Sequence, residues 1–594
     1  MPRYDAPVRD MRFVLHELLD IHKYNNLPGF SELTPELVDA ILDEGAKFTK
    51  EVLHPLNAVG DVQGCVRNAD ASVKTPDGFP EAYKAMVEGG WPAMAADPAY
   101  GGQGLPHVLN VAYMEMSSSA NMAFSMYPGL THGAYSAIHV SGTDEQKQTY
   151  LPKLASGQWS GTMNLTEPQC GTDLGLMKTK ASPEADGSYK ITGQKIWISG
   201  GEQDLSENII HLVLARIEGA PEGIKGISLF IVPRNILDAD GNPGEKNALS
   251  CGGLEEKMGI HGNATCVMNY DGATGYLIGE PNKGMRTMFV MMNAARLGVG
   301  LQGLAQSEIA YQNAVDFAKD RLQSRALSGV AAPEKPADPI IVHPDVRRML
   351  MDQKAFNEGA RAFAYWTMLQ NDLQHLSDNA GVKEKAEDYM GLLTPVVKAF
   401  LTDRGFRHCS DALQLHGGSG YTREWGMEQF LRDSKIAMIY EGTNGIQALD
   451  LVGRKLVSNS ARAIMTYAGE VDAFIAENET DDAMKEFIEP LKSAKDLLQD
   501  GTMWLMQNGL EDPNNAGAAS HDYLQLFGLT TLGYMWAWMA KVAQSKSGSG
   551  DPFYSEKLDT ARYYMQRYLP EAGMHLSKMK SGAAPLFALE AEQF

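Results

Sequence analysis

Cysteine is scarce in this 594-residue sequence, and its few cysteines form no recognised metal-binding or disulfide pattern. They are widely scattered, and none belongs to a Cys-x-x-Cys pair: Cys65, Cys170, Cys251, Cys266 and Cys409. This pattern excludes a disulfide framework and favours a reducing compartment, so we expect a cytoplasmic protein. The fourteen histidines also lack the spacing of metal ligands, and no metal site is predicted.

Positive charge is in deficit as well. The chain has 52 Lys and Arg against 74 Asp and Glu, which gives a formal net charge of −22. A surface this acidic repels nucleic-acid phosphates and anionic lipid headgroups, so neither is an expected partner.

Long apolar runs are nearly absent. The first thirteen residues, MPRYDAPVRDMRF, are charged, and no secretory signal is predicted from them. Residues 523–540 are rich in apolar side chains but include Gln525, two threonines and two glycines. We therefore predict a buried helix there and no membrane insertion.

Composition and periodicity predict a mixed α+β protein with several domains. Hydrophobic residues make up 44% of the chain, as in ordinary globular proteins, and 594 residues exceed the size of a single core. Helical patterns dominate the first part, where Thr34 is placed to cap a helix that begins at Pro35. Short β-rich runs follow between Trp159 and Ile278, and helical periodicity then returns, broken by a Pro- and Ala-rich loop. The predicted domains are 1–160 (helical), 161–281 (β), 282–458 (helical) and 459–594 (a further helical block).

The glycine motif GVGLQG at 298–303 formally matches the dinucleotide-binding fingerprint GxGxxG. That fingerprint requires a preceding strand, whereas the residues before this motif have a helical pattern. We interpret its glycines as small residues that allow close helix packing. The sequence contains no P-loop, HExxH zinc helix or GxSxG nucleophile motif.

Two segments of the β block are suited to an aromatic ligand. Residues 163–166 offer a strand edge whose backbone groups suit a planar heterocycle, and Thr166 and Thr172 add hydroxyls. Trp197 and Ser199 are two residues apart and therefore share one face of a strand, where an indole stacks beside a hydroxyl. A core tryptophan and turn threonines are the alternative that these residues alone leave open.

A third segment, 413–447, combines a glycine-rich turn with an isolated acid. The glycines of HGGSG permit the close backbone approach that a pyrophosphate requires. Glu441 follows a mostly apolar run and precedes Gly442, so its carboxylate is partly desolvated and suited to act as a general base. The alternative is a surface glutamate at a helix N-terminus beside the capping residue Thr443.

Taken together, these segments resemble the acyl-CoA dehydrogenase family. Each segment alone is weak evidence, but eight in the family's order are specific. They fall between about Glu81 and Arg454: GTDEQKQTYLPKLASG, TEPQCGTD, GQKIWISGG, EEKMGIHGNATC, GEPNKGM, AARLGVGLQGLAQ, QLHGGSGY and MIYEGTNGIQ. The resemblance implies an N-terminal helical domain, a central β-barrel-like domain and a C-terminal four-helix bundle, here followed by an extra C-terminal helical domain.

The resemblance also implies a reaction that uses FAD. Glu441 matches the catalytic base, which takes a proton from the α-carbon of an acyl-CoA thioester while the β-hydrogen leaves as hydride to flavin N5. In the family, the base's own backbone N–H and a ribityl hydroxyl of FAD polarise the thioester carbonyl. An electron-transfer flavoprotein is the expected electron acceptor.

Other residues carry over from the family by position. The FAD-binding positions are Met163, Leu165, Thr166, Thr172, Trp197, Ser199, Arg321, Gln414, Gly417, Gly418, Thr443 and Gly445. Ser199 matches the residue that faces flavin N5. Gln414, Gly417 and Gly418 match positions that reach the FAD of a neighbouring subunit, which implies at least a dimer. The substrate-binding positions are Thr172, Asn293, Arg296, Tyr440 and Gly442.

The sequence departs from the family at the adenine end of the FAD site. Where the family often has Arg-x-x-Phe-Gly, Arg321 is followed by Leu-Gln-Ser-Arg, so the aromatic contact is lost. Pro344 stands where a glutamine is often found, and the insertion APEKPADP lies in the same region. We expect this end of the site to be built differently.

The length of the chain narrows the resemblance further. About 140 residues follow Arg454, and this long form resembles a bacterial branch of the family that includes dehydrogenases of 3-methylmercaptopropionyl-CoA and of fatty acyl-CoAs. We expect oxidation of 3-(methylthio)propanoyl-CoA to 3-(methylthio)acryloyl-CoA, in dimethylsulfoniopropionate degradation, by a homodimer. The alternatives are a short- or medium-chain fatty acyl-CoA dehydrogenase, an acyl-CoA oxidase and a non-catalytic flavoprotein that binds a macromolecule. The methionines of 285–292 form either a soft channel wall or helix core.

Overall fold

The structure is a computed structural model that describes residues 2–594. It groups the chain into two compact units, each built from segments far apart in sequence. Unit 1 contains the chain up to Glu44, His107–Glu115 and Val299–Phe594, and unit 2 contains Gly45–Pro106 and Met116–Gly298. The four consecutive domains expected from the sequence therefore remain a prediction.

The first predicted helix begins at the expected residue. Helix α2 (Pro35–Phe48) starts at Pro35, and the Oγ1 atom of Thr34 accepts a hydrogen bond from the Leu37 N–H at 3.2 Å. A proline at this position loses nothing, because its missing N–H would have no partner inside the helix. The helices that follow before the β region are α3 (Pro55–Gln63), α4 (Phe79–Glu88), α5 (His107–Ala120), α6 (Met122–Ser141) and α7 (Asp144–Ala155).

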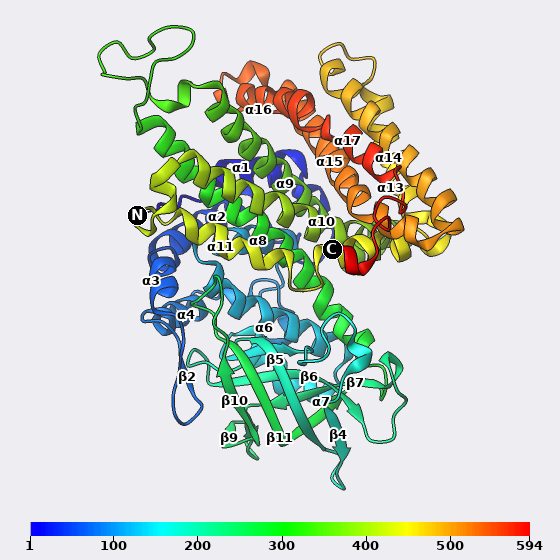
Figure 1. Cartoon of the computed structure of the whole chain (residues 1–594). Coiled ribbons are helices and arrows are strands. Elements are labelled where there is room, and N and C mark those ends of the chain that lie inside the picture. Colours follow the sequence, from blue (N-terminus) through cyan, green and yellow to red (C-terminus); the bar gives the residue numbers. More distant parts are fainter. Residues whose placement is uncertain (1) are drawn as a thin grey trace. The chain divides into compact units, whose positions relative to one another are not determined.

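Unit 2 contains a closed β-barrel, which confirms the predicted β-barrel-like domain (Figure 1). Its circuit runs β11–β5–β4–β6–β7 and returns to β11, while β3 pairs with β6 and β10 pairs with β11 outside the circuit. The strands are β3 (Trp159–Asn164), β4 (Lys180–Pro183), β5 (Tyr189–Ser199), β6 (Asn208–Ile217), β7 (Ile227–Pro233), β10 (Leu249–Leu254) and β11 (Thr265–Ile278). Two small hairpins accompany them: β1 (Val66–Arg67) with β2 (Val73–Lys74), and β8 (Asn235–Leu237) with β9 (Pro243–Lys246).

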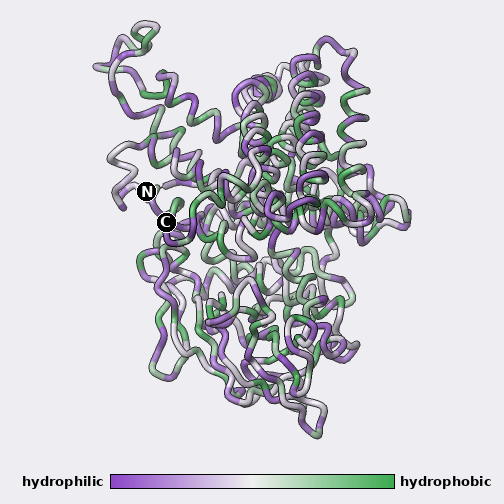
Figure 2. The backbone as a smooth tube through the Cα atoms, turned by 45° about the vertical axis from the view of Figure 1, so that its right-hand side comes forward, coloured by the Kyte–Doolittle hydropathy of each residue, from purple (hydrophilic) through white to green (hydrophobic). Residues whose placement is uncertain are grey.

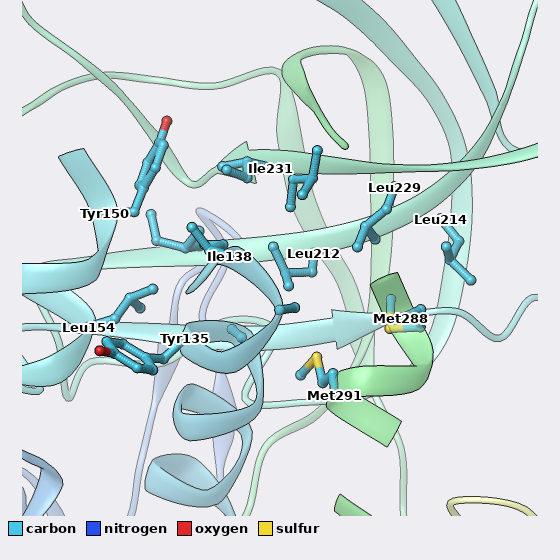
Figure 3. Packing of buried hydrophobic residues seen from close by; sticks show 14 of the residues in the cluster. Tyr135, Ile138, Tyr150, Leu154, Leu212, Leu214, Leu229, Ile231, Met288 and Met291 are labelled. Carbon is cyan, nitrogen blue, oxygen red and sulfur yellow. The ribbon is translucent and has the colours of Figure 1, made fainter. Parts of the chain in front are cut away.

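Strands β6 and β7 are buried on both faces along most of their length, which explains their nearly unbroken apolar sequences. In β6, Val213 belongs to one buried cluster, and its neighbours Leu212 and Leu214 belong to another. The second cluster also includes residues of α6 and α7 and two methionines, Met288 and Met291 (Figure 3). Both methionines are fully buried, so the Met-rich segment contributes to the core, as the helix-core alternative predicts.

Three long helices of the second half confirm the interpretation of GVGLQG. They are α8 (Gly284–Asp320), α9 (Pro344–Leu376) and α10 (Ala380–Leu415). The motif lies inside α8, where a Cβ added at Gly303 would come within 2.5 Å of the Leu401 carbonyl oxygen on α10. Gly300 meets the Val397 carbonyl oxygen in the same way, at 2.8 Å. The glycines therefore permit close packing of two helices.

The last block is helical, as predicted, and its longest helix is the buried one expected from residues 523–540. Helix α15 (Pro513–Ser545) contains Trp536, which is fully buried and donates from Nε1 to the Ala355 carbonyl oxygen at 2.9 Å. The tube in Figure 2 has hydrophilic and hydrophobic residues interspersed along its helices. Within residues 2–594 no helix has the length and apolarity that a membrane span would need. The other helices after α10 are α11 (Met427–Lys435), α12 (Asn444–Asp450), α13 (Arg462–Asn478), α14 (Lys485–Glu511), α16 (Pro552–Tyr563) and α17 (Glu571–Met579).

Candidate functional site

The first predicted flavin positions lie at the end of β3 in unit 2. Met163 is in the strand, Leu165 and Thr166 follow directly after it, and all three side chains are half-buried. The Thr166 carbonyl oxygen accepts a hydrogen bond from the Ile196 N–H of β5 at 3.0 Å. Thr172 is exposed in the loop that follows. The structure therefore places residues 163–166 at a strand edge beside β5, as the sequence predicts.

Trp197 and Ser199 lie at the end of β5, where the strand contains a β-bulge. Ile196 and Trp197 together occupy the place opposite one residue of β11, because Lys195 pairs with Met268 and Ile198 with Cys266. Trp197 has a φ of 60°, an uncommon backbone conformation for a bulky residue. Its indole is 61% exposed, while Ile198 is buried and Ser199 is half-buried. The bulge thus presents a large aromatic ring on the surface of unit 2, close in sequence to a hydroxyl.

A buried ion pair holds these two segments together. Lys195 is fully buried, and its Nζ donates to the Glu167 Oε1 at 2.8 Å and to the Leu165 carbonyl oxygen at 3.0 Å. Burial alone would raise the pKa of Glu167, but Lys195 and neighbouring donors lower it to about 2. Burial also lowers the pKa of Lys195. We assign the pair as ionised at neutral pH, because Glu167 also accepts hydrogen bonds from Thr179 and the Lys178 N–H.

We expect Lys195→Met to destabilise unit 2 and to weaken the FAD binding that is predicted for this strand end. The substitution leaves a buried carboxylate without its cation and a backbone carbonyl without its donor, which costs about 3–5 kcal/mol. The measurement is the free energy of unfolding, together with the FAD retained after ultrafiltration. Glu167 stabilises the fold above its ordinary pKa of 4.5, and this contribution is lost as the pH falls toward 2, so the wild-type advantage over the variant shrinks in acid.

Lys190→Met on the same strand is the matched control. Lys190 is half-buried and donates to the Thr274 hydroxyl at 3.0 Å, so its loss costs less than about 1 kcal/mol. If Lys195→Met has the same free energy of unfolding and the same FAD retention as this control, the Lys195–Glu167 pair does not support the strand end.

Glu441 lies in a tight left-handed turn of unit 1. Its φ is 56° and that of Gly442 is 82°, and the side chain of Glu441 is half-buried. The left-handed φ of Gly442 would strain any residue with a side chain, so this position favours glycine. Thr443 caps α12 as its alternative role predicts, since its Oγ1 accepts from the Ile446 N–H at 3.3 Å. Gly445 is exposed in the first turn of that helix.

Tyr440 lies beside the candidate base. Its hydroxyl donates to the Oε1 of Gln302 on α8. Burial raises the pKa of the Tyr440 phenol, and the charge of Glu441 raises it further. The phenol therefore stays neutral and adds an apolar ring next to the carboxylate.

The glycine-rich turn and Arg321 come together in unit 1. The Arg321 guanidinium lies 4.9 Å from the ring centre of Phe317, which stacks on His416 at 4.3 Å, directly before Gly417. Added Cβ atoms at Gly417 and Gly418 would meet nothing within 4 Å, and Gly417 has a φ of 60°. These two glycines and Gln414 are exposed. The family's aromatic residue after Arg321 is missing, and the aromatic ring that Arg321 contacts in this structure is that of Phe317.

The Pro- and Ala-rich insertion is organised around a buried carboxylate. Asp338 is fully buried and accepts hydrogen bonds from three backbone N–H groups, those of Ala326, Ala331 and Ala332, at 2.8–3.1 Å. Arg325 donates to it at 3.0 Å. These donors, the Ala326 N–H foremost, hold the pKa of Asp338 well below its usual range. Arg325, one of the departures from the family pattern, thus stabilises the insertion.

The remaining substrate positions, Asn293 and Arg296, lie one turn apart on the part of α8 that belongs to unit 2. Asn293 is exposed and Arg296 is buried. Sequence reasoning missed the Lys195–Glu167 pair and Gln447, which donates from Nε2 to the carbonyl oxygens of Glu441 and Gly442 at 3.2 and 3.4 Å. The sequence feature that could have pointed to them is their location, because each lies inside or beside a family motif.

The chemistry of these residues fits a flavin nucleotide. Unit 2 offers an exposed indole, a half-buried hydroxyl and a strand edge. Unit 1 offers an exposed guanidinium and glycine backbone with open space beside it. An indole can stack on the planar ring of a flavin, hydroxyl and backbone groups can hydrogen-bond to it, and a guanidinium and glycine N–H groups can bind its phosphates.

Comparison with known domain families gives four matches in chain order. Models described as the N-terminal, middle and C-terminal domains of acyl-CoA dehydrogenase match residues 39–158, 162–273 and 282–456. A fourth, described as acetyl-CoA dehydrogenase C-terminal like, matches residues 467–590. Together the matches span most of the chain.

Full-length relatives were found among characterised proteins. The chain is 41% identical to 3-methylmercaptopropionyl-CoA dehydrogenase of Ruegeria pomeroyi, over 97% of this chain and 98% of the relative. It is 34% identical to a broad-specificity linear acyl-CoA dehydrogenase of Mycobacterium tuberculosis, over 96% of each chain.

Solved structures share the fold. ACDH-11 of Caenorhabditis elegans, in complex with C11-CoA, aligns with a TM-score of 0.78 at 18% identity, over 95% of this chain and 91% of that chain. An acyl-CoA dehydrogenase of Bacillus anthracis complexed with FAD aligns with a TM-score of 0.75 at 22% identity, over 94% and 89%. A chain from the electron transferring flavoprotein structure of Acidaminococcus fermentans aligns with a TM-score of 0.59 at 25% identity, over 72% and 99%.

Proposed function

This chain belongs to the acyl-CoA dehydrogenase family, and we propose that its substrate is 3-methylmercaptopropionyl-CoA, which it oxidises to 3-(methylthio)acryloyl-CoA. As a family member it is a FAD-dependent oxidoreductase that acts on an acyl-CoA thioester. The single observation that carries the choice of substrate is the 41% identity to the Ruegeria enzyme over nearly the whole of both chains. This reaction is a step in the degradation of dimethylsulfoniopropionate.

In the proposed mechanism, Glu441 takes the proton from the α-carbon of the thioester. Its half-buried carboxylate is partly shielded from water, which favours its use as a base. The backbone N–H of Glu441 donates to the thioester carbonyl and stabilises the negative charge that develops there. Bound FAD supplies the hydride acceptor for the β-hydrogen.

The residues proposed to hold FAD are those carried over by position from the family. Trp197, Ser199 and the strand-edge residues 163–166 would hold the flavin ring, and Arg321 would hold the pyrophosphate. Thr172, Thr443 and Gly445 complete this set. Asn293, Arg296, Tyr440 and Gly442 line the path of the acyl-CoA.

Several further properties are part of the proposal. The exposed positions of Gln414, Gly417 and Gly418 suit contact with the FAD of a second subunit, so we assign a homodimer. An electron-transfer flavoprotein is the proposed electron acceptor. The cytoplasm is the proposed compartment, since all five cysteines are free thiols.

Substrate specificity is tested by anaerobic mixing of the oxidised holoenzyme with a short panel of thioesters, followed by the loss of flavin absorbance. Pentanoyl-CoA is the matched comparison, because it replaces the thioether sulfur of 3-methylmercaptopropionyl-CoA by a methylene. We expect both five-atom chains to react at least about 10-fold more efficiently than octanoyl-CoA, since a pocket of fixed depth discriminates against extra methylenes. Faster reaction with 3-methylmercaptopropionyl-CoA than with pentanoyl-CoA would indicate recognition of sulfur.

Other outcomes would replace the proposal. A preference for butanoyl- or octanoyl-CoA would assign a fatty acyl-CoA dehydrogenase, which the 34% identical mycobacterial relative makes the second candidate. Peroxide formed in air in proportion to the substrate consumed, without an added acceptor, would assign an oxidase. Absence of bleaching with every thioester would leave a non-catalytic flavoprotein.

A further inference from the structure

Helix α12, which follows the base-bearing turn, is anchored at its first residue. Asn444 lies three residues after Glu441 and is 8% exposed. Its Nδ2 donates to the Asp403 Oδ1 at 2.7 Å and to the Thr402 Oγ1 at 2.9 Å, and its Oδ1 accepts from the Lys398 Nζ at 2.7 Å. Both ends of this amide are therefore bonded to helix α10.

The anchor continues from α10 into the C-terminal block. The second carboxylate oxygen of Asp403 accepts from the Nε2 of Gln525 on α15 at 2.8 Å. Gln525 is 3% exposed, and its Oε1 accepts from the Arg404 Nε at 3.3 Å, so its side chain has one orientation. Gln525 is one of the few polar side chains in the buried stretch of α15.

The turn that this chain of hydrogen bonds supports is strained. Glu441 has a left-handed backbone, which a residue with a side chain rarely adopts, and strain of this kind persists only where the surroundings enforce it. Gln447 bonds the carbonyl oxygens of Glu441 and Gly442 from one side. Asn444 fixes the start of the helix that follows the turn. Gln447 and Asn444 both belong to α12.

We propose that Gln525, Asp403 and Asn444 form a relay of positioning residues through which the C-terminal block holds Glu441 in place for proton abstraction. This inference rests on the proposed role of Glu441. It gives helix α15 a part in the reaction, although none of its residues is assigned to substrate or cofactor. Of the polar residues on α15, Gln525 is the one that reaches α12 through a single shared carboxylate.

Gln525→Met tests the relay, because it keeps the length of the side chain and removes both hydrogen bonds. In the FAD-loaded enzyme we expect kcat for flavin reduction to fall about 10- to 100-fold with KM within about twofold, as for a displaced catalytic group. We also expect amide hydrogen exchange of a peptide that covers residues 439–450 to be at least about 10-fold faster. This second readout does not depend on turnover.

Thr531→Val is the matched control. Thr531 is fully buried on the same helix, and its hydroxyl bonds the Tyr467 hydroxyl on α13 at 2.9 Å, so the variant also loses a hydrogen bond between helices. We expect normal kcat and normal exchange at 439–450 in this variant. Equal losses in both variants would show general weakening of α15 and overturn the relay.

The outcomes separate the relay from the proposed function. Unchanged exchange at 439–450 in Gln525→Met, or faster exchange with unchanged kcat, would overturn the relay. Suppose that exchange is faster in Gln525→Met but that no thioester reduces the flavin of the wild type. This result would refute the proposed function and, with it, a positioning role in that reaction. If Gln525→Met does not fold, Asn444→Ala tests the same link from the other end, with the same two expected results.

Discussion

Glu441→Gln is expected to bind FAD normally but to lose reduction of the flavin by acyl-CoA, with the rate falling about 10²- to 10⁴-fold. The amide keeps the size and hydrogen-bonding reach of the carboxylate but does not accept a proton, and general-base catalysis contributes a factor of this order. The left-handed turn is retained, because Gln447 bonds backbone carbonyls and not the side chain of residue 441. The measurement is stopped-flow bleaching of the flavin under anaerobic conditions.

Glu424→Gln is the control for this loss. Glu424 is an exposed carboxylate of the same unit, so its neutralisation changes the net charge by the same amount. We expect its bleaching rate to equal that of the wild type. Normal bleaching in Glu441→Gln would remove Glu441 from its proposed role.

Arg361→Met is expected to lower the free energy of unfolding by about 3–5 kcal/mol. Arg361 is 1% exposed and donates to Glu115 at 2.6 and 2.9 Å, to Glu308 at 3.0 Å and to Asp10. The substitution removes the cation that these three buried carboxylates share. Asp10 still pairs with Lys557 after the substitution. The three carboxylates lie on helices α1 (Val8–Arg12), α5 and α8, so the loss affects widely separated segments of unit 1.

The pH dependence of this loss has a defined sign. Burial raises the pKa of Glu115, and Arg361 opposes that rise, so removal of Arg361 moves the pKa of Glu115 higher still. Protonation then relieves the uncompensated charge. We expect the difference between wild type and variant, measured by urea unfolding, to be larger at pH 8 than at pH 5.

Arg562→Met is the matched control for Arg361→Met. Arg562 pairs with Glu486 at 3.0 Å and Asp559 at 2.7 Å, but all three side chains are more than one third exposed. Exposed pairs of this kind contribute at most about 1 kcal/mol. A similar loss in the two arginine variants would show that the buried cluster contributes no more than a surface pair.

The fold was largely predictable where one physical signal dominates. The segments that form β6 and β7 are apolar and rich in β-branched residues because these two strands are buried on both faces. Thr34 and Pro35 marked a helix start by capping chemistry alone. In contrast, β4 and β10 contain proline or paired glycines and depend on their neighbours in the sheet, and the two-residue strands β1 and β2 are too short to show alternation.

The candidate site was predictable as a set of positions but not as a geometry. Spacing placed Trp197 and Ser199 on one strand face, yet the bulge that exposes the indole depends on pairing with β11. The acid at Glu441 was visible in its motif. Its left-handed backbone and the hydrogen bonds of Gln447 and Asn444 that support the turn depend on tertiary contacts. Gln525 lies more than eighty residues beyond Glu441, and no local pattern connects them.

The central claim is that Glu441 removes the α-proton of an acyl-CoA, and the most direct measurement follows that hydrogen itself. Holoenzyme is mixed anaerobically with 3-methylmercaptopropionyl-CoA that carries two deuterium atoms at the α-carbon, and the recovered thioester is analysed by mass spectrometry. We predict that the wild type releases one deuterium to water as the enoyl thioester forms, which keeps the other, and that the thioester recovered from Glu441→Gln keeps both. Release by Glu441→Gln at the wild-type rate would contradict the claim.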